Sequence, residues 1–288
     1  MKTKLLFLTL FLMGLTLTAK AQFNAFVIEK AVKQDTIGQL QLLVQYDLTA
    51  YIDTTNKENP VKETMMLEIG KNLSKFYSYP RYVLDSVFAA DVANKASQET
   101  INEHLQQYNK GRISEVTVNG YPSGKVTTLD EVGGLSKIRC EEARELPQWS
   151  IAEDTTHILS YLCQKATCHY KGRKWTAWYT TEIPLSEGPW KLYGLPGMIL
   201  KAEDSEGHYS FIALGVEKAH TNRPILYKGK TFESMNRKTY NKVHERFYDD
   251  PVGFVNGCRP GVTMKVTDEH GNPMRPRGLP HNPIERAQ

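Results

Sequence analysis

Eight histidines and four cysteines are the side chains with the widest chemical repertoire in this chain of 288 residues. The histidines form no HExxH pattern, and the chain has no CxxC pair, GxSxG elbow or phosphate-binding loop. Asp154 and His157 lack a nucleophile motif beside them and fit a solvated turn. His244 and Glu245 are typical of a solvated pair on a helix. The sequence therefore predicts no catalytic residue, no metal site and no cofactor.

The first 21 residues predict export. Lys2 and Lys4 precede an apolar run from Leu5 to Leu17, and Ala19-Lys20-Ala21 follows, which is typical of a signal peptide cleaved before Gln22. The run is shorter than the roughly 20 residues of a membrane span, and no other run approaches that length. We expect an exported protein of the periplasm or the outer-membrane face, without a transmembrane span.

The charge of the mature chain disfavours nucleic acid as a partner. The formal net charge is +4, from 36 basic and 32 acidic residues. Three of the lysines lie in the predicted signal peptide, so the mature chain has 33 basic against the same 32 acidic residues. A chain with this near-neutral charge has no excess of basic residues to form the surface that nucleic acid would require.

The four cysteines are disulfide candidates, because an exported compartment favours oxidation. Cys163 and Cys168 are five residues apart, so on one strand they would point to opposite faces with Cα atoms roughly 16 Å apart. A disulfide requires less than about 7 Å. We therefore expect a long-range bridge from Cys258 to the sheet through Cys140, Cys163 or Cys168, with four free thiols as the alternative.

The stretch Gly188 to Leu200 has the most unusual composition, and it contains Gly194-Leu195-Pro196-Gly197. Proline fixes one φ, and a following glycine permits a positive φ, which fits a rigid type II turn. The turn could plug the end of the core. Alternatively it could form the lip of a ligand pocket. The ligand-binding residues would then be Trp175, Trp178, Trp190, Tyr193 and Leu195.

Alternating apolar residues predict an antiparallel sheet. The expected strands cover 39–53, 65–69, 76–77, 113–118, 125–129, 135–140, 157–170, 173–182, 198–204 and 209–216. Lys171-Gly172 predicts a hairpin turn, and the strand 209–216 is apolar on both faces, which indicates a central strand covered on both sides. We expect an opening meander of three strands and at least four consecutive antiparallel strands over 149–217.

Two segments have helical spacing. Residues 81–110 predict one or two helices with a break near 94–97, and residues 232–248 predict a helix with Thr231 as its N-cap and Pro251 after its end. Met235, Val243 and Phe247 would pack on the sheet. The class is α+β, mostly antiparallel β-sheet, and the meander could curve into a half-barrel.

We expect one domain over 22–257 between the signal peptide, 1–21, and a proline-rich, irregular tail, 258–288. The sequence contains no internal repeat, and no linker divides it.

Several motifs together resemble the GLPGLI family, a group of exported Gram-negative proteins of unknown function. The chain has Gly194-Leu195-Pro196-Gly197-Met198-Ile199, with Met in place of Leu, and Ser160 to Ala166 is similar to the family's Gly-Tyr-x-Cys-x-Lys-Ala strand, with Ser in place of Gly. Gly172-Arg173, Ala177 to Thr180, Glu182 to Pro184 and the terminal Asn282-Pro283-Ile284-Glu285 also match. The resemblance implies export and an accessory role beside TonB-dependent outer-membrane receptors, and it supplies no catalytic residue.

Two classes of function follow as hypotheses. The first is a non-catalytic binding or accessory protein of the envelope, which has an outer-membrane receptor as partner and holds an apolar or peptide ligand. The second is an envelope hydrolase of peptides or lipids, for which a nucleophile, a base and an orienting acid would have to meet in a pocket within hydrogen-bond reach. The sequence favours the first.

Overall fold

The computed structural model describes residues 21–24, 34–258, 263–267, 270, 272–274 and 278–286. Residues 1–20 of the predicted signal peptide lie outside this part, so the predicted cleavage before Gln22 stays a prediction. Among the described residues, no helix combines the length and apolar character that crossing a bilayer requires.

The described residues form a twelve-stranded open sheet, antiparallel except where β15 pairs with β8. Across the sheet, the strands are β15 (Glu233–Met235), β8 (Ser136–Ala143), β7 (Lys125–Val132), β6 (Val116–Asn119), β5 (Ser74–Ser78), β4 (Val61–Ile69), β3 (Leu42–Ala50), β13 (Tyr209–Lys218), β12 (Met198–Asp204), β11 (Arg173–Thr180), β10 (Tyr161–Tyr170) and β9 (Ser150–Ile158).

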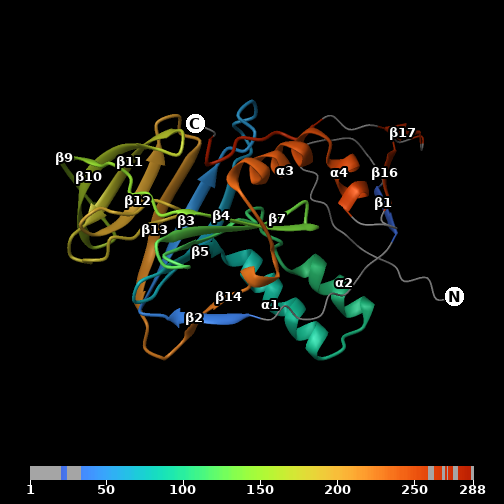
Figure 1. Ribbon diagram of the computed structural model, residues 1–288, viewed down its shortest axis with the longest axis horizontal. Helices are drawn as coiled ribbons and strands as arrows, with labels where there is room; N and C mark the ends of the chain where they lie inside the picture. The colour runs from blue at the N-terminus through green and yellow to red at the C-terminus, as the bar shows by residue number, and fades with distance from the viewer. Residues whose placement is uncertain are drawn as a thin grey trace.

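Two meanders make up this sheet. Strands β3 to β8 follow one another on one side, strands β9 to β13 do so on the other, and β13 joins them by pairing with β3. Figure 1 shows β9 to β12 at one end of the molecule and the helices at the other. The expected opening meander and the consecutive antiparallel strands over 149–217 are both confirmed. The α+β class, mostly β, is confirmed with them.

Four α-helices complete the architecture, namely α1 (Tyr79–Ala93), α2 (Gln98–Gln107), α3 (Arg237–Asp249) and α4 (Pro251–Cys258). The predicted break near 94–97 is confirmed, because Ser97 caps α2 by accepting a hydrogen bond from the Thr100 amide. Ser78 caps α1 in the same way. Both helices are inserted between β5 and β6.

The predicted late helix is shorter than expected at its start. Residues 229–231 form a 3₁₀ turn, η1 (Gly229–Thr231), and Met235 belongs to β15. Asn236, not Thr231, is the N-cap of α3, and its side chain accepts from the Thr239 amide. Pro251 does not end the helical region but begins α4, a position where its missing N–H costs nothing. Val243 and Phe247 pack from α3 on the sheet as predicted, whereas Met235 is itself part of the sheet.

The region of Cys163 and Cys168 differs from the prediction in two ways. The strand expected over 157–170 is two strands, because Leu159 takes a positive φ of 55° in the turn between β9 and β10. The pairing of β10 with β9 also contains a bulge, in which β9 advances from Thr155 to Ile151 while β10 advances from Gln164 to Ala166. Cys163 and Cys168 are both buried in the main core, although their spacing predicted opposite faces.

The strand β13 is central, as predicted, but it is not covered on both faces. Phe211 and Ala213 face the main core. Ile212 and Leu214 point to the other side and are 40% and 50% exposed. The alternation of apolar residues predicted the strand correctly, but the prediction that its second face is covered was wrong.

Two small sheets stand beside the main one. Strand β2 (Asp35–Gln39) pairs with β14 (Pro224–Tyr227), and β16 (Thr263–Thr267) pairs with both β1 (Ala21–Asn24) and β17 (Pro273–Met274). The tail was expected to be irregular, and β16 corrects that prediction. Met264 and Val266 alternate along β16 and are both buried.

Candidate functional site

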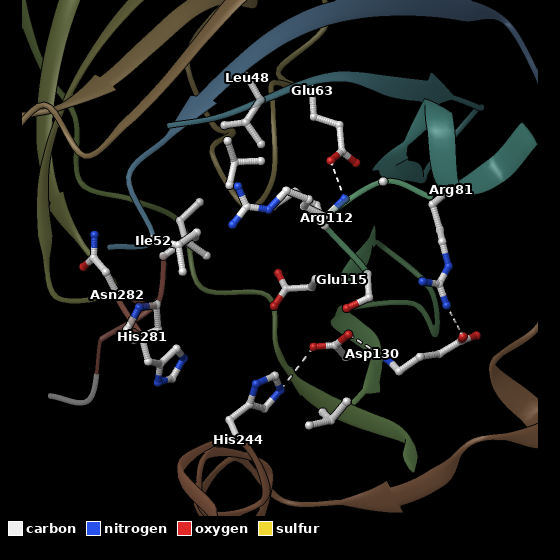
Figure 2. A pocket seen from close by; sticks show the side chains of 18 of the residues that line it. Leu48, Ile52, Glu63, Arg81, Arg112, Glu115, Asp130, His244, His281 and Asn282 are labelled. Carbon is white, nitrogen blue, oxygen red and sulfur yellow. Dashed lines mark hydrogen bonds and ion pairs between the residues drawn. The ribbon is translucent and has the colours of Figure 1, made fainter. Parts of the chain in front are cut away.

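A cleft of about 1930 Å³ lies between the β3–β8 meander, helices α1 to α3 and the C-terminal segment. Its lining comes from residues 48–65, 81–88, 105–117, 130–137, 237–248 and 279–285, with Phe76, Trp190, Tyr209 and Phe211. Ionisable groups of both signs and apolar side chains share this lining. Figure 2 shows Glu115, Asp130, His244 and His281 around the cavity.

Glu115 lies on the loop that leads into β6. Its Oε1 accepts a hydrogen bond from the Trp190 indole at 3.1 Å, and its Oε2 lies 3.3 Å from the Tyr240 hydroxyl. Burial raises the pKa of Glu115, and the positive charges of Lys191 and Arg237 only partly offset this effect. The geometry therefore favours a carboxyl group that keeps its proton at higher pH than an ordinary glutamate.

Asp130 lies on β7 beside Glu115, and its pKa shifts in the opposite direction. Burial alone would raise the pKa of Asp130, but hydrogen bonding and charge attraction from His244 outweigh it, with further hydrogen bonds from Ser114 and the Glu131 amide. The net pKa is lowered. Asp130 is thus held as a carboxylate.

His244 lies on α3 and faces Asp130. Its Nε2 is 3.2 Å from Asp130 Oδ2, an ion-pair distance without the alignment of a good hydrogen bond. The imidazole packs on the Tyr240 ring at 4.6 Å between centroids. The helix therefore brings an imidazole to a buried carboxylate at the floor of the cleft (Figure 2).

Tyr240, one turn before His244 on α3, joins the two carboxyl groups. Its hydroxyl is 3.3 Å from Glu115 Oε2 and 3.5 Å from Asp130 Oδ2. Burial, followed by the negative charges of Glu115 and Asp130, raises the pKa of Tyr240, so the phenol stays neutral. One phenolic hydrogen cannot serve two carboxylates at once. The phenol donates to Glu115 Oε2 or to Asp130 Oδ2, so the two carboxyl groups share one donor, and a protonated Glu115 reduces the repulsion between them.

The loop over 109–115 is fixed to β4 by a buried glutamate. Glu63 Oε2 accepts a hydrogen bond from the Arg112 amide at 2.6 Å. Burial raises the pKa of Glu63, while the hydrogen bonds to it lower it less strongly. The Arg112 guanidinium extends into the same cavity (Figure 2).

The C-terminal segment forms one wall of the cleft. His281 stacks on Tyr248 with ring centroids 3.9 Å apart and planes within 7°. Burial, helped by the nearby His244, lowers the pKa of His281 to about 4. His281 is therefore neutral at neutral pH.

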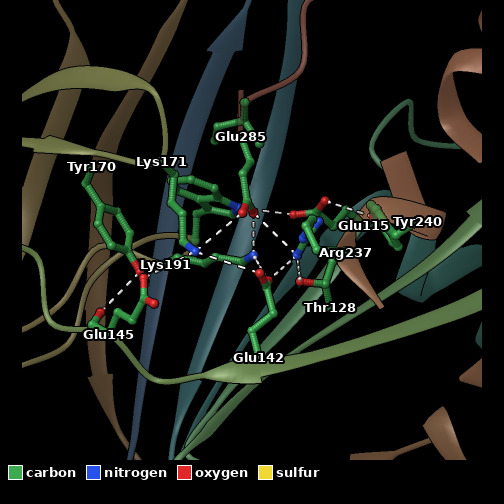
Figure 3. Close-up of polar contacts among 12 residues, drawn as sticks. Glu115, Thr128, Glu142, Glu145, Tyr170, Lys171, Lys191, Arg237, Tyr240 and Glu285 are labelled. Atoms are coloured by element: carbon green, nitrogen blue, oxygen red, sulfur yellow. Dashed lines mark hydrogen bonds and ion pairs between the residues drawn. The ribbon is translucent and has the colours of Figure 1, made fainter. Parts of the chain in front are cut away.

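An ion-pair network holds this wall in place (Figure 3). The buried Lys191 ammonium lies 2.5 Å from Glu285 and 3.3 Å from Glu142. Arg237 binds Glu142 and lies 3.4 Å from Glu285. Burial tends to raise the pKa of Glu142, but Arg237 and Lys191 lower it to about 2. The network connects β8, α3 and the tail.

Arg173 anchors the tail from the other side. Its fully buried guanidinium lies 2.7 Å from Asp204 and donates to Asn282 Oδ1 and the Pro283 carbonyl. Asn282 in turn donates to the Tyr51 carbonyl. The fold thus brings together three segments on which the family resemblance rests, around Arg173, Lys191 and Asn282.

Of the five predicted ligand-binding residues, only Trp190 lines the cleft. Trp175, Tyr193 and Leu195 are at most 1% exposed, and Trp178 is half-buried and packs against the main core. The interpretation as a pocket lip is therefore wrong for Trp175, Tyr193 and Leu195, because the loop turns inward. These three residues instead fit the alternative prediction, a turn whose apolar side chains fill the end of the core.

Gly194 and Gly197 are each required for a different structural reason. Of these two residues, Gly194 takes the positive φ, of 93°. Gly197, which follows Pro196, is not the one. A Cβ on Gly197 would lie 2.0 Å from the Thr180 carbonyl oxygen, so close backbone approach requires glycine there.

The predicted long-range disulfide is wrong in this structure. Cys140, Cys163 and Cys168 are buried free thiols, so none of them is bridged to Cys258. Burial raises the pKa of Cys163 to about 11 and that of Cys168 to about 12. Packing of α4 and the ion pairs of Arg173 and Lys191 anchor the C-terminal region instead.

Among the described residues, Asp204, Glu206 and His208 form a group with potential ligand atoms within 4.8 Å of one another. Arg173 binds Asp204, and Arg286 binds Glu206 at 2.5 and 2.8 Å. These carboxylates are already engaged by cations, so the group acts as an ion-pair cluster of the tail.

Sequence reasoning missed the residues at the floor of the cleft. Asp130 and His244 are far apart along the chain, and no short motif signals their contact. His244 was interpreted as solvated beside Glu245, yet its side chain is only 16% exposed. The one available signal was Asp130 itself, a charged residue within an apolar strand pattern.

Comparison with known proteins gives a short family match. A family model described as a protein of unknown function, Porph_ging, matches residues 169–201, which include β11 and the Gly194–Ile199 motif. The GLPGLI name itself stays a resemblance. A search of the curated proteins finds no match.

Two solved structures, both of PNGF-II, resemble parts of the chain. The one in space group P21 has a TM-score of 0.46 and 15% identity over 70% of this chain and 32% of that one. The one in space group C2 has 0.48 and 14% over 73% and 33%. This chain thus spans about a third of the length of those chains. Values this low assign neither fold nor function.

Proposed function

We propose that the protein is an exported binding protein of the cell envelope that holds a peptide in the cleft. The observation that carries this proposal is the cleft itself, about 1930 Å³, with charged groups buried along its floor. Burying a charged group lowers the stability of the fold, so charges kept along the floor of a cleft favour a role in binding. A cleft of this size accommodates a segment of several residues.

The mixed lining favours a peptide over a purely apolar ligand. Ile52 and Phe88 offer apolar contacts, while Asp130 and Arg112 offer charged ones. A wholly apolar ligand would remove these charged groups from water without replacing their hydrogen bonds. A peptide provides amides and side chains for both kinds of surface.

The setting of this binding is proposed from the sequence. The signal peptide cleaved before Gln22 and the family resemblance support a location in the periplasm or at the outer-membrane face, with an outer-membrane receptor as partner. The curved half-barrel expected from the meander belongs to the same proposal, with the cleft on its concave side.

The alternative, an envelope hydrolase, is favoured by one observation. The imidazole of His244, the carboxylate of Asp130 and the carboxyl group of Glu115 converge at the cleft floor. We develop the chemistry of this group below.

Gentle purification from envelope fractions tests the binding proposal. Native mass spectrometry of the wild-type protein should reveal bound peptides. Ile52→Trp should deplete them, because Ile52 faces the cavity (Figure 2). Ile212→Trp is the matched control on the outer face of β13 and should retain them. Absence of bound peptide from the wild type, or equal loads in both variants, would contradict the proposal.

A further inference from the structure

We propose that the floor of the cleft hydrolyses an amide bond of the bound peptide, with His244 as general base, Glu115 as general acid and water as nucleophile. The inference rests on the proposed function, because the peptide must occupy the cleft first. It goes beyond binding, because it gives the protein an activity.

His244 and Asp130 have the arrangement of a base and its orienting acid. The contact of 3.2 Å between Nε2 and Asp130 Oδ2 leaves Nδ1 to take a proton. Asp130 is buried and fixed by the Glu131 amide at 2.6 Å, so its carboxylate stays beside the imidazole. Asp130 is therefore a positioning residue. Such contacts often tighten when substrate binds.

Glu115 has the surroundings of a proton donor. It lies in the cleft lining and holds the Trp190 indole N–H on one oxygen. The single hydrogen of the Tyr240 hydroxyl also favours a protonated Glu115 beside an ionised Asp130. Burial raises the pKa of Glu115, whereas the net pKa of Asp130 is lowered. Two neighbouring carboxyl groups with opposed pKa shifts are typical of acid–base sites.

The nucleophile is water rather than a side chain. Ser114 is the hydroxyl nearest to the group, and it hydrogen-bonds to Asp130. A serine nucleophile would instead have to reach the imidazole, which removes its proton. An open cleft supplies water directly.

The reaction balances without an added reagent. The water oxygen attacks the amide carbon while His244 Nδ1 takes one of its protons, and the carbonyl electron pair moves to the carbonyl oxygen. The C–N bond then breaks, its electron pair stays on nitrogen, and Glu115 donates a proton to that nitrogen. The products are a carboxylic acid and an amine. Solvent in the cleft takes the proton from His244 and returns one to Glu115.

The test uses the full mature chain and a library of unmodified synthetic peptides in heavy-oxygen water. Mass spectrometry locates the cleavages and detects one heavy oxygen in each new carboxyl group. His244→Gln and Glu115→Gln should lower kcat by about 100-fold or more. Asp130→Asn should lower kcat with little change in KM, because the amide orients the wrong tautomer.

Matched controls lie outside the cleft. Asp154→Asn and Glu203→Gln change exposed carboxylates on β9 and β12 and should leave the rate unchanged. Circular dichroism verifies the fold of each variant. If Asp130→Asn does not fold, His244→Gln still tests the inference. This variant should fold, because the imidazole borders the cleft rather than the core.

The outcomes separate the two proposals. Peptide binding without cleavage overturns the hydrolytic inference and leaves the binding protein intact. Cleavage that survives in His244→Gln and Glu115→Gln also overturns the inference. If the wild type neither binds nor cleaves the library peptides, both proposals fail.

Discussion

The two meanders of the sheet use their buried faces differently. Strands β10 to β13 bury aromatic and aliphatic side chains such as Trp175, Tyr179 and Leu200 in the main core. Strands β4 and β5 add Val61, Met65 and Phe76 to the same core. The first meander buries charge as the Arg173–Asp204 pair, whereas the second buries Glu63 and Asp130 at the cleft. Charge buried beside a cavity stabilises the fold poorly. The comparison distinguishes a meander that serves only as scaffold from one that also borders the cleft, where we propose that the ligand binds.

The ion pairs between the two regions give the largest expected effect. Lys191→Ala should destabilise the protein by about 3–5 kcal/mol, because it leaves Glu142 and Glu285 with fewer cations in a buried site. Lys165→Ala, which removes an exposed pair with Asp154, should cost less than about 1 kcal/mol. Chemical denaturation measures both. If both variants lost the same free energy of unfolding, the ion pairs of Lys191 would not stabilise the contact between the two regions.

Close packing in the scaffold gives the next effect. Gly197→Ala should cost about 3 kcal/mol, because the new Cβ would overlap the Thr180 carbonyl. Gly215→Ala, which has open space on β13, should change the free energy of unfolding by less than about 0.5 kcal/mol. A tolerated Gly197→Ala would contradict the close approach.

Acid should weaken the functional region. The pKa values of Glu131 and Glu142 are about 2 in the fold, below the usual value of 4.5. Their contribution is complete above the unfolded pKa and is lost as the pH falls through the folded one, from about 4.5 to about 2. Each carboxylate contributes about 3 kcal/mol by linkage. Unfolding measured across this range should show the decline, and Glu142→Gln should reduce its slope.

The cysteines of the scaffold give the smallest effect. Cys163 and Cys168 should resist alkylation in the folded protein at neutral pH, because burial raises their pKa values to about 11 and about 12. Both should react fully in denaturant. Mapping of unreduced peptides that finds either cysteine in a disulfide would reinstate the bridge expected from the sequence.

The scaffold was largely predictable from the sequence, and the site was not. Period-two alternation identified β3 and β10 to β13, because each buries one face. The bulge after Gln164 escaped prediction, since the extra residues that β9 inserts there leave no mark in composition. Asp130 and His244 meet only because α3 packs on β7 and β8, and contacts of that kind depend on tertiary packing.

The central claim is that the cleft, not the outer face of the sheet, is where this protein meets its ligand. Hydrogen–deuterium exchange of the mature chain with and without an envelope peptide extract tests it most directly. The account predicts protection over residues 108–115 and 279–285, which line the cleft, and unchanged exchange over β9 and β10. Protection confined to β9 and β10, with none in the cleft lining, would contradict it.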